Sequence, residues 1–303
     1  MASNPSTSQH RDVETRSVPI EGQLDLRNTL RPAHGHFTDD GWWLPARTPH
    51  GPGSMKIHRT RENLIGEAWG PGASWLLDRL EAIGGLEDDP SQFETDDPVV
   101  SELHERYLGR RFSRTGLVFD SLLVAICGQK VTGHGAHLAL TGLNRRFSDA
   151  APGPHSWLRL PADPERMAEA PYYEFHELHL EKRRADVIRA VSRAAQRLND
   201  LRGSDVETAT GILESIPGVS LWTRAKTLEV SHGDPDQVPV GDFHIKHIVV
   251  HHLTGRDRGT DEEMLDLLEP FRPQRGRVIR LLHTLGHEPK FGPRSTPRDI
   301  TRM

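Results

Sequence analysis

The stretch at residues 212–245, ILESIPGVSLWTRAKTLEVSHGDPDQVPVGDFHI, decides the fold expected of this chain. Apolar residues at helical spacing lead into the turn IPGVS at 216–220, and a second helical run begins at once. A Pro-Gly turn between two short helices brings unpaired backbone N–H groups to a helix start, where they can hold a phosphate oxygen. Because Asp242 follows along the same stretch, the pattern indicates a clamp for the DNA backbone with a carboxylate nearby.

This combination resembles the signature of the helix-hairpin-helix (HhH-GPD) DNA glycosylase superfamily, and within it most closely the branch of bacterial 3-methyladenine DNA glycosylase II. The family turn reads apolar-Pro-Gly-apolar-Gly, with a threonine shortly afterwards. The resemblance implies that the DNA backbone is held by Pro217, Gly218, Val219, Ser220 and Thr223. Ser220 replaces the second glycine and would strain the turn if a positive φ were needed there. The alternative interpretation of the turn is a purely structural one.

Asp242 matches the catalytic aspartate of the family. Taken alone, an aspartate at or near the first position of a helix is a capping residue, and both roles can hold together. The resemblance implies that its carboxylate stabilises the oxocarbenium-like state formed when an N-glycosidic bond breaks. It could also orient or deprotonate the attacking water.

Trp222 stands where bifunctional relatives carry a lysine that forms a Schiff base with the sugar. An indole cannot be that nucleophile, so we predict a monofunctional enzyme that leaves an intact abasic site. In the family branch named above a tryptophan at this place belongs to the base pocket, where electron-poor alkylated bases gain from stacking on it. The alternative is that Trp222 only fills the core.

Further positions follow from the resemblance. The helix ending in Gly-Gln leads to the intercalation site, so Gln129 and Lys130 are predicted to fill the gap left by an extruded base. Many relatives have an apolar wedge there. Lys182 is the predicted phosphate contact. Lys226 and His283 stand where aromatic side chains were expected, which leaves the lesion preference open.

No cofactor is expected to be required. The resemblance implies a possible monovalent cation, Na⁺ or K⁺, held by the backbone carbonyls of Glu214, Ile216 and Val219. An iron–sulfur cluster is excluded because Cys127 is the one cysteine in the chain. Three histidines of FHIKHIVVHH (243–252) share a helical face at a spacing that could bind zinc, but no acidic or cysteine partner stands out.

The chain has 303 residues and a net charge of −5, which argues weakly against a nucleic-acid partner. The charge is uneven, with basic runs at 106–114, 181–190 and 272–280. No stretch reaches the roughly 18–20 apolar residues needed to cross a bilayer. The first residues lack the apolar core of a signal peptide, so we expect a cytoplasmic protein, associated with the nucleoid in a bacterial cell.

The expected fold class is mostly α with a small α+β N-terminal domain. Residues 1–18 are expected to be disordered, 19–97 to form the α+β domain, 98–287 the helical glycosylase domain and 288–303 a loose tail. Helical periodicity predicts a helix at 75–85 and then helices at 98–109, 117–131, 134–147, 164–169, 176–198, 205–215, 220–231, 242–254, 261–269 and 273–287.

The sequence therefore predicts a monomeric, monofunctional DNA N-glycosylase that flips alkylated purines of the 3-methyladenine type out of double-stranded DNA. Two alternatives stay open. The first is a catalytically impaired protein that binds DNA or senses lesions, favoured by the departures at Ser220, at Lys130 and at the pocket positions Lys226 and His283. The second is a glycosylase for other damaged bases, such as deaminated or oxidised ones. The role of the N-terminal domain and any protein partners are not predicted.

Overall fold

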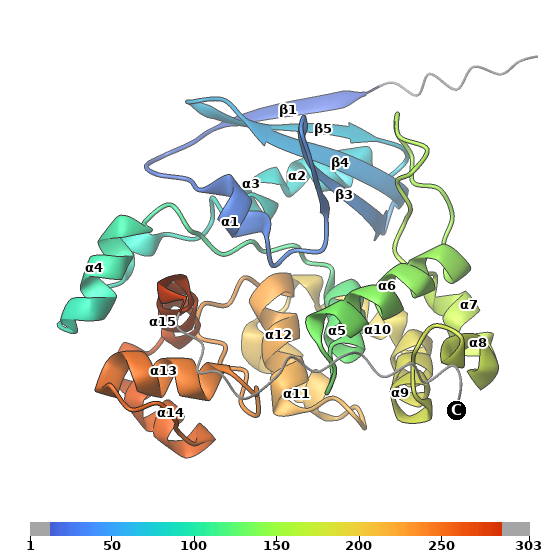
Figure 1. Cartoon of the computed structure of the whole chain (residues 1–303). Helices are drawn as coiled ribbons and strands as arrows, with labels where there is room; N and C mark the ends of the chain where they lie inside the picture. Colours follow the sequence, from blue (N-terminus) through green and yellow to red (C-terminus); the bar gives the residue numbers. More distant parts are fainter. Residues whose placement is uncertain (1–12, 287–303) are drawn as a thin grey trace, which may run out of the picture.

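The computed structural model describes residues 13–286. A five-stranded antiparallel sheet forms one layer, and most of the helices lie together below it (Figure 1). This arrangement confirms the predicted fold class. No helix among residues 13–286 is long and apolar enough to span a membrane.

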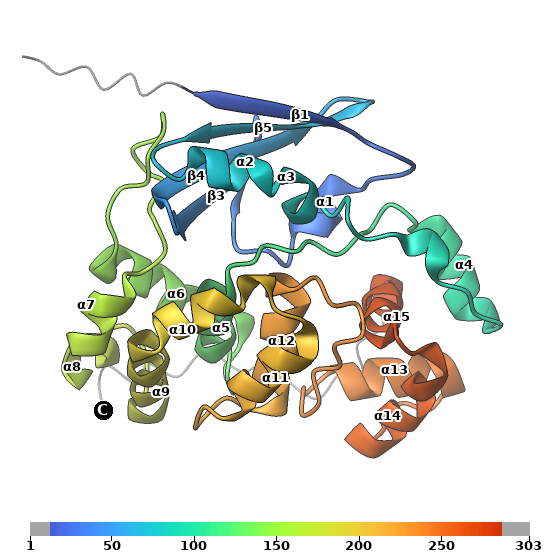
Figure 2. The same ribbon diagram turned by 180° about the vertical axis from the view of Figure 1, so that it is seen from behind.

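The sheet has the strand order β1-β5-β4-β3-β2. Its strands are β1 (Glu14–Pro19), β2 (His36–Thr38), β3 (Gly41–Thr48), β4 (Gly51–Arg59) and β5 (Asn63–Trp69). Burial alternates along β5, where Leu64, Gly66 and Ala68 are buried while Ile65 and Glu67 are only partly buried. The buried face is covered by α2 (Ala73–Asp78) and α3 (Leu80–Ile83), which Figure 2 shows from the front.

The prediction of a disordered N-terminus is wrong for residues 14–18. These residues form most of β1, which pairs with β5 along its whole length, from Glu14 opposite Ala68 to Pro19 opposite Asn63. The stretch is polar because β1 is an edge strand with one solvent face, and only Val18 is deeply buried. Residues 1–12 and the whole of the predicted tail, 288–303, lie outside the described residues.

The remaining elements are helical. After α1 (Leu26–Leu30), the helices beyond the sheet are η1 (Pro90–Gln92), α4 (Pro98–Arg106), α5 (Val118–Cys127), α6 (Gly133–Phe147), α7 (Pro164–Glu169), α8 (Tyr172–His176), α9 (Lys182–Arg193), α10 (Ala195–Asn199), η2 (Asp200–Gly203), α11 (Val206–Glu214), α12 (Leu221–Ser231), α13 (Ile245–Thr254), α14 (Asp261–Leu268), η3 (Glu269–Phe271), α15 (Arg275–Leu282) and η4 (His283–Leu285).

The single helix predicted at 176–198 is wrong, because this region holds the end of α8, then α9 and α10. His179 has a φ of +61°, a left-handed conformation that ends the helical path after α8. The apolar periodicity continues through the break because Leu180 is fully buried there. Periodicity therefore placed the buried face correctly but not the interruption.

Three main hydrophobic clusters hold the chain together. The first surrounds α5 and α9 and includes Leu228 of α12. The second lies between the sheet and its helices and includes Val230 of α12. The third joins α4 with α13, α14 and α15 and includes Ile245. Helix α12 thus contributes to two cores, and α13, which follows it in the chain, belongs to the third.

A cavity of about 50 Å³ lies between β3, α5, α6 and the end of α12. Its lining is mostly apolar, with the polar side chains of His34, Asp120 and Asn144 among it. Desolvation raises the pKa of the Asp120 carboxyl from 3.8 to about 7, although Arg47 and Arg202 act in the opposite direction. Ionisation of the buried Asp120 carboxyl therefore lowers the free energy of unfolding.

We expect Asp120→Asn to stabilise the protein above pH 7, because the amide removes a carboxyl that ionises less readily in the folded state than in the unfolded state. Since its folded pKa is raised, the wild type loses this part of its stability as pH climbs from about 4 to about 7. The variant should melt higher by about 3–6 °C at pH 8 and similarly to wild type at pH 4. Thermal unfolding across this pH range is the measurement, and a pH-independent difference would contradict the expectation.

Candidate active site and DNA interface

The predicted hairpin is present, formed by α11, a turn at residues 215–220 and α12. Gly218 has a φ of +90°, which favours glycine. A Cβ atom at Gly218 would lie 2.3 Å from Cγ2 of Val187 in α9, so the turn also packs too closely for any other side chain. The N–H of Val219 donates to the carbonyl of Ile216 at 3.1 Å and closes the turn.

Ser220 does not strain the turn. Its φ is −82° and it is the N-cap of α12, with its hydroxyl oxygen accepting the backbone N–H of Thr223 at 3.3 Å. The serine therefore replaces a family glycine without any need for positive φ. An ion pair at 3.0 Å between Arg224 of α12 and Glu214 of α11 ties the two helices of the hairpin together.

The structure brings Trp222 and Asp242 into direct contact. The indole N–H of Trp222 donates to Oδ2 of Asp242 at a distance of 2.8 Å between heavy atoms. The other carboxylate oxygen, Oδ1, accepts the backbone N–H groups of His244 at 2.8 Å and Ile245 at 3.2 Å, at the start of α13. The carboxylate is thus fixed by a side chain from α12 and by the first N–H groups of α13.

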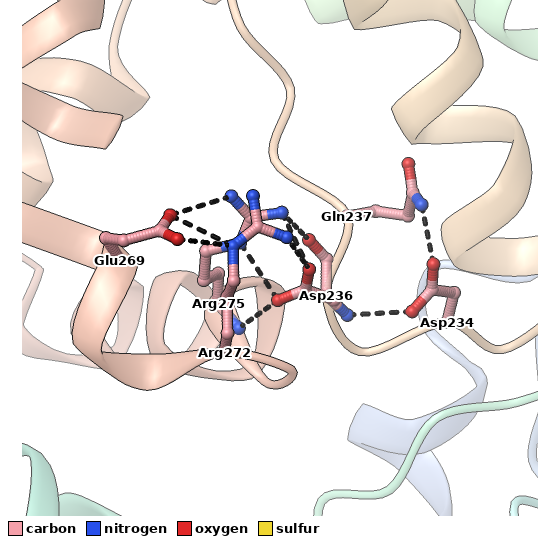
Figure 3. Close-up of polar contacts among 6 residues, drawn as sticks. All are labelled: Asp234, Asp236, Gln237, Glu269, Arg272 and Arg275. Atoms are coloured by element: carbon pink, nitrogen blue, oxygen red, sulfur yellow. Dashed lines mark hydrogen bonds and ion pairs between the residues drawn. The ribbon is translucent and has the colours of Figure 1, made fainter. Parts of the chain in front are cut away.

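The loop that carries Asp242 runs from α12 to α13 and is held at its beginning by a cluster of ions (Figure 3). Arg275 of α15 donates to both carboxylate oxygens of Asp236, at 2.9 and 2.6 Å. Arg272 bonds Glu269 and also reaches Asp236 at 3.3 Å. Because the side chains of Arg275 and Asp236 are mostly buried, this bidentate ion pair anchors the beginning of the loop firmly.

The end of the same loop has a second anchor. The backbone N–H of Gly241, whose φ is +88°, donates to Oδ1 of Asp261 at 3.0 Å. Lys246 of α13 pairs with the other oxygen of Asp261 at 2.9 Å. Partial burial would raise the pKa of Asp261, but the hydrogen bond from the Gly241 N–H and the Lys246 ammonium outweigh it and lower that pKa, so Asp261 stays ionised at neutral pH. The loop that carries Asp242 is therefore fixed both at Asp236 and beside Asp242 itself, where Asp261 binds Gly241 and Lys246.

Gln129 and Lys130 lie at the end of α5 and differ sharply in their surroundings. The side-chain amide of Gln129 donates to the carbonyl of Gly218 at 3.0 Å and to Oγ1 of Thr223 at 2.8 Å. Lys130 is exposed and has a φ of +53°. Trp222 packs against the same helix end, since a Cβ at Gly128 would lie 3.1 Å from its ring.

One turn beyond Trp222 on α12, Lys226 pairs with Glu229, and Arg280 of α15 donates to the other oxygen of Glu229 at 2.8 Å. Burial would raise the pKa of Glu229, but Lys226 and Arg280 outweigh it and lower that pKa to about 2. Desolvation and the nearby Lys226 also lower the pKa of His34 from 6.5 to about 4, against the effect of Glu229. At neutral pH this group therefore holds two cations, one anion and a neutral imidazole.

The remaining predicted positions are the phosphate contact Lys182 and the carbonyl ligands of a monovalent cation. Lys182 is the first residue of α9, the helix that packs on the hairpin, and its exposed ammonium pairs with Asp186 at 2.9 Å. The carbonyl of Ile216, a predicted cation ligand with those of Glu214 and Val219, accepts one N–H and keeps a second lone pair. Across residues 13–286 no three His, Cys, Asp or Glu side chains are arranged to hold a metal ion.

Comparison with known proteins identifies the family. A family model described as HhH-GPD superfamily base excision DNA repair protein matches residues 123–273. The chain belongs to this superfamily. The matched region begins inside α5 and includes the hairpin, Trp222 and Asp242. The prediction of superfamily membership is thereby confirmed. No curated protein matches the chain in sequence.

Solved structures share the fold over part or most of the chain. The 3-methyladenine DNA glycosylase from Archaeoglobus fulgidus has a TM-score of 0.74 at 16% identity, covering 89% of this chain and 97% of its own. The 8-oxoguanine glycosylase/lyase of Clostridium acetobutylicum, in complex with DNA, has a TM-score of 0.71 at 14% identity, covering 91% and 98%. The 3-methyladenine DNA glycosylase Mag1 of Schizosaccharomyces pombe, bound to abasic DNA, has a TM-score of 0.52 at 17% identity, covering 64% and 94%. These likenesses show the fold alone.

Sequence reasoning missed the residues that support the site. The pair between Asp236 and Arg275 and the group around Glu229 join residues 39 and 51 positions apart, so no local pattern announces them. The basic run at 272–280 was the available signal. Arg275, Arg277 and Arg280 of this run pair with the carboxylates of Asp236, Asp88 and Glu229 inside the protein.

We expect Gly218→Ala to destabilise the protein by about 2–4 kcal/mol and to weaken DNA binding, since a methyl group there needs a positive φ and collides with Val187. Gly211→Ala is the matched control, because Gly211 lies on α11 with open space around it. That change should stabilise the helix by about 0.5–1 kcal/mol. Urea unfolding and titration with duplex DNA measure both effects. Equal behaviour of the two variants would show that the turn is not constrained as described.

Proposed function

We propose that this protein is a monofunctional DNA glycosylase that hydrolyses the N-glycosidic bond of alkylated purines of the 3-methyladenine type. The observation that carries the proposal is the hydrogen bond from Trp222 to Asp242. It places an indole, and no amine, beside the carboxylate at the hairpin. The nearest lysine along α12, Lys226, is one turn away and paired with Glu229. Trp222 cannot form a Schiff base, which supports hydrolysis by water as the reaction of this site.

The chemistry assigns one role to each group. As the bond between C1′ and the base nitrogen breaks, its electron pair leaves with the base and positive charge grows on the sugar. The carboxylate of Asp242 stabilises this charge, and its three hydrogen bonds hold it in place before the reaction. Water then adds to C1′ and gives a proton to Asp242 or to solvent. The product is an abasic site in an uncut strand.

The remaining parts handle the DNA. The N–H groups at the start of α12 bind a backbone phosphate, and Lys182 approaches another from the neighbouring helix α9. Lys130, exposed at the end of α5, enters the space left by the extruded base, in the region predicted for Gln129 and Lys130. The protein acts as a monomer on double-stranded DNA in the cytoplasm, with no required cofactor and at most a monovalent cation at the hairpin.

We expect the wild type to release methylated purines from alkylated duplex DNA and to leave the strand uncut until alkali is added. Asp242→Asn should lower the single-turnover rate by about two to four orders of magnitude while duplex binding persists. Chromatography of released bases and denaturing gels of the DNA provide the measurements. Nicking without alkali would refute the monofunctional mechanism. Intact DNA binding without base release by the wild type would favour a lesion-sensing protein.

A second candidate substrate is favoured by the group around Glu229. Lys226 and Arg280 carry two positive charges against one negative charge, while His34 is neutral. The net positive charge one turn from Trp222 opposes a cationic base such as 7-methylguanine. An ammonium also donates to carbonyl oxygens, which deaminated and oxidised purines present. A glycosylase for such neutral bases is therefore the runner-up.

We expect Lys226→Met to separate the two candidates. If the pocket takes neutral oxo-purines, release of hypoxanthine or 8-oxoguanine should fall by about threefold to tenfold, because a donor to the base is lost. Release of 7-methylguanine should rise by a similar factor, because the repulsion is gone. Lys226→Arg, which keeps the charge, is the control. Equal changes on both classes of substrate would exclude a role for Lys226 in choosing the base.

A further inference from the structure

The side-chain amide nitrogen of Gln129 is fully engaged within the protein. Its Nε2 atom carries two protons, and these go to the carbonyl of Gly218 and to Oγ1 of Thr223. The carbonyl of Gly218 can only accept, so the amide nitrogen must face the hairpin. The backbone N–H of Gln129 also donates to Ile126 at 3.1 Å and closes the last turn of α5. The residue thus joins the end of α5 to the hairpin turn.

The bond to Thr223 fixes the direction of a second hydrogen bond. Thr223 is completely buried, and Oγ1 already accepts a proton from Gln129. A buried hydroxyl proton needs an acceptor, and Oγ of Ser220 lies 3.0 Å away. The Thr223 hydroxyl therefore donates to Ser220. Because Oγ of Ser220 also accepts the N–H of Thr223, its own proton points away from these partners.

Ser220 is exposed at the N-terminal end of α12, where the hairpin N–H groups and the helix dipole favour binding of an anion. An outward hydroxyl proton adds a side-chain donor to these backbone donors. This donor exists because serine stands where the family has glycine. Its direction depends on Gln129, two hydrogen bonds away.

We propose that Gln129 is a positioning residue that latches the hairpin to the end of α5 and turns the Ser220 hydroxyl proton toward the DNA backbone. It does not enter the DNA stack, a task that falls to Lys130 alone. The inference rests on the proposed function, since it presumes that the hairpin binds DNA. It separates two neighbouring residues that the sequence pattern assigns to one role.

The first test needs no DNA. Gln129→Met keeps the length of the side chain and removes both donated protons, so the turn at 216–223 should exchange its amide hydrogens faster, by about fivefold or more. Lys130→Ala should leave this exchange unchanged. A residue whose only role is to intercalate between bases cannot alter amide hydrogen exchange in the protein without DNA. Unchanged exchange in Gln129→Met would overturn the latch.

The second test is a double-mutant cycle on binding to undamaged duplex and to duplex with an abasic analogue. Gln129→Met and Thr223→Val should each weaken binding by about threefold to tenfold, and the double variant should be scarcely weaker than either. Ser220→Gly, which keeps most of the capping, should match them. Ser204→Gly is the matched control for loss of a serine hydroxyl, because Ser204 lies just before α11, at the end of that helix away from the turn. This variant should bind DNA as the wild type does.

A third measurement distinguishes latching from intercalation. The probe is 2-aminopurine placed at the position that is flipped out. Its fluorescence in the complex should be lower with Lys130→Ala than with the wild type, and the size of this decrease should depend on the base opposite the probe. At saturating protein, Gln129→Met should keep the wild-type signal. Additive losses in the cycle, or a loss of extrusion by Gln129→Met at saturation, would overturn the proposal. Failure of the wild type to bind any duplex would refute the proposed function instead, and hydrogen exchange would still decide the latch.

Discussion

The hydrogen bond between the indole of Trp222 and the carboxylate of Asp242 crosses the junction between two hydrophobic cores. Trp222 belongs to α12, which packs with α5 in one core, and Asp242 precedes α13, which belongs to another. Neither core can fix the carboxylate alone. The geometry of the site therefore depends on how firmly the two groups of helices are held against each other, and the buried ion pair between Arg280 of α15 and Glu229 of α12 crosses that boundary.

This ion pair is one of three that have a common form, an arginine of α15 and a carboxylate from elsewhere in the chain. Arg275 holds Asp236 in the loop to α13, Arg277 holds Asp88 before α4 at 2.6 Å, and Arg280 holds Glu229 of α12. Paired charges of this kind add little net stability compared with apolar contacts, but they have strict geometry. Such contacts suit a boundary that must keep one relative placement, because a shifted arrangement would leave buried charges without partners.

The sequence predicted the parts of the site that a short stretch encodes and missed those that two distant stretches encode. The turn around Gly218 and the aspartate near a helix start are local patterns, and both lie where the chain was expected to place them. Helices with clear capping signals, such as Asp163 before α7, were predicted at their observed ends. The bonds from Gln129 span 89 and 94 residues, so no local pattern indicated that its side-chain amide is engaged with the hairpin.

The net charge of −5 shows why overall composition says little about a DNA-binding surface of this type. Many acids of this chain neutralise internal arginines and contribute no field to the outside, as Asp88, Glu229 and Asp236 do. The hairpin, in turn, offers backbone N–H groups and a serine hydroxyl, which carry no formal charge and are invisible in a charge count. Recognition of a phosphate by such donors depends on their orientation. The packing of Gly218 on Val187 and the amide of Gln129 hold the hairpin turn in place, so the proposed binding surface follows from the fold more than from the charge.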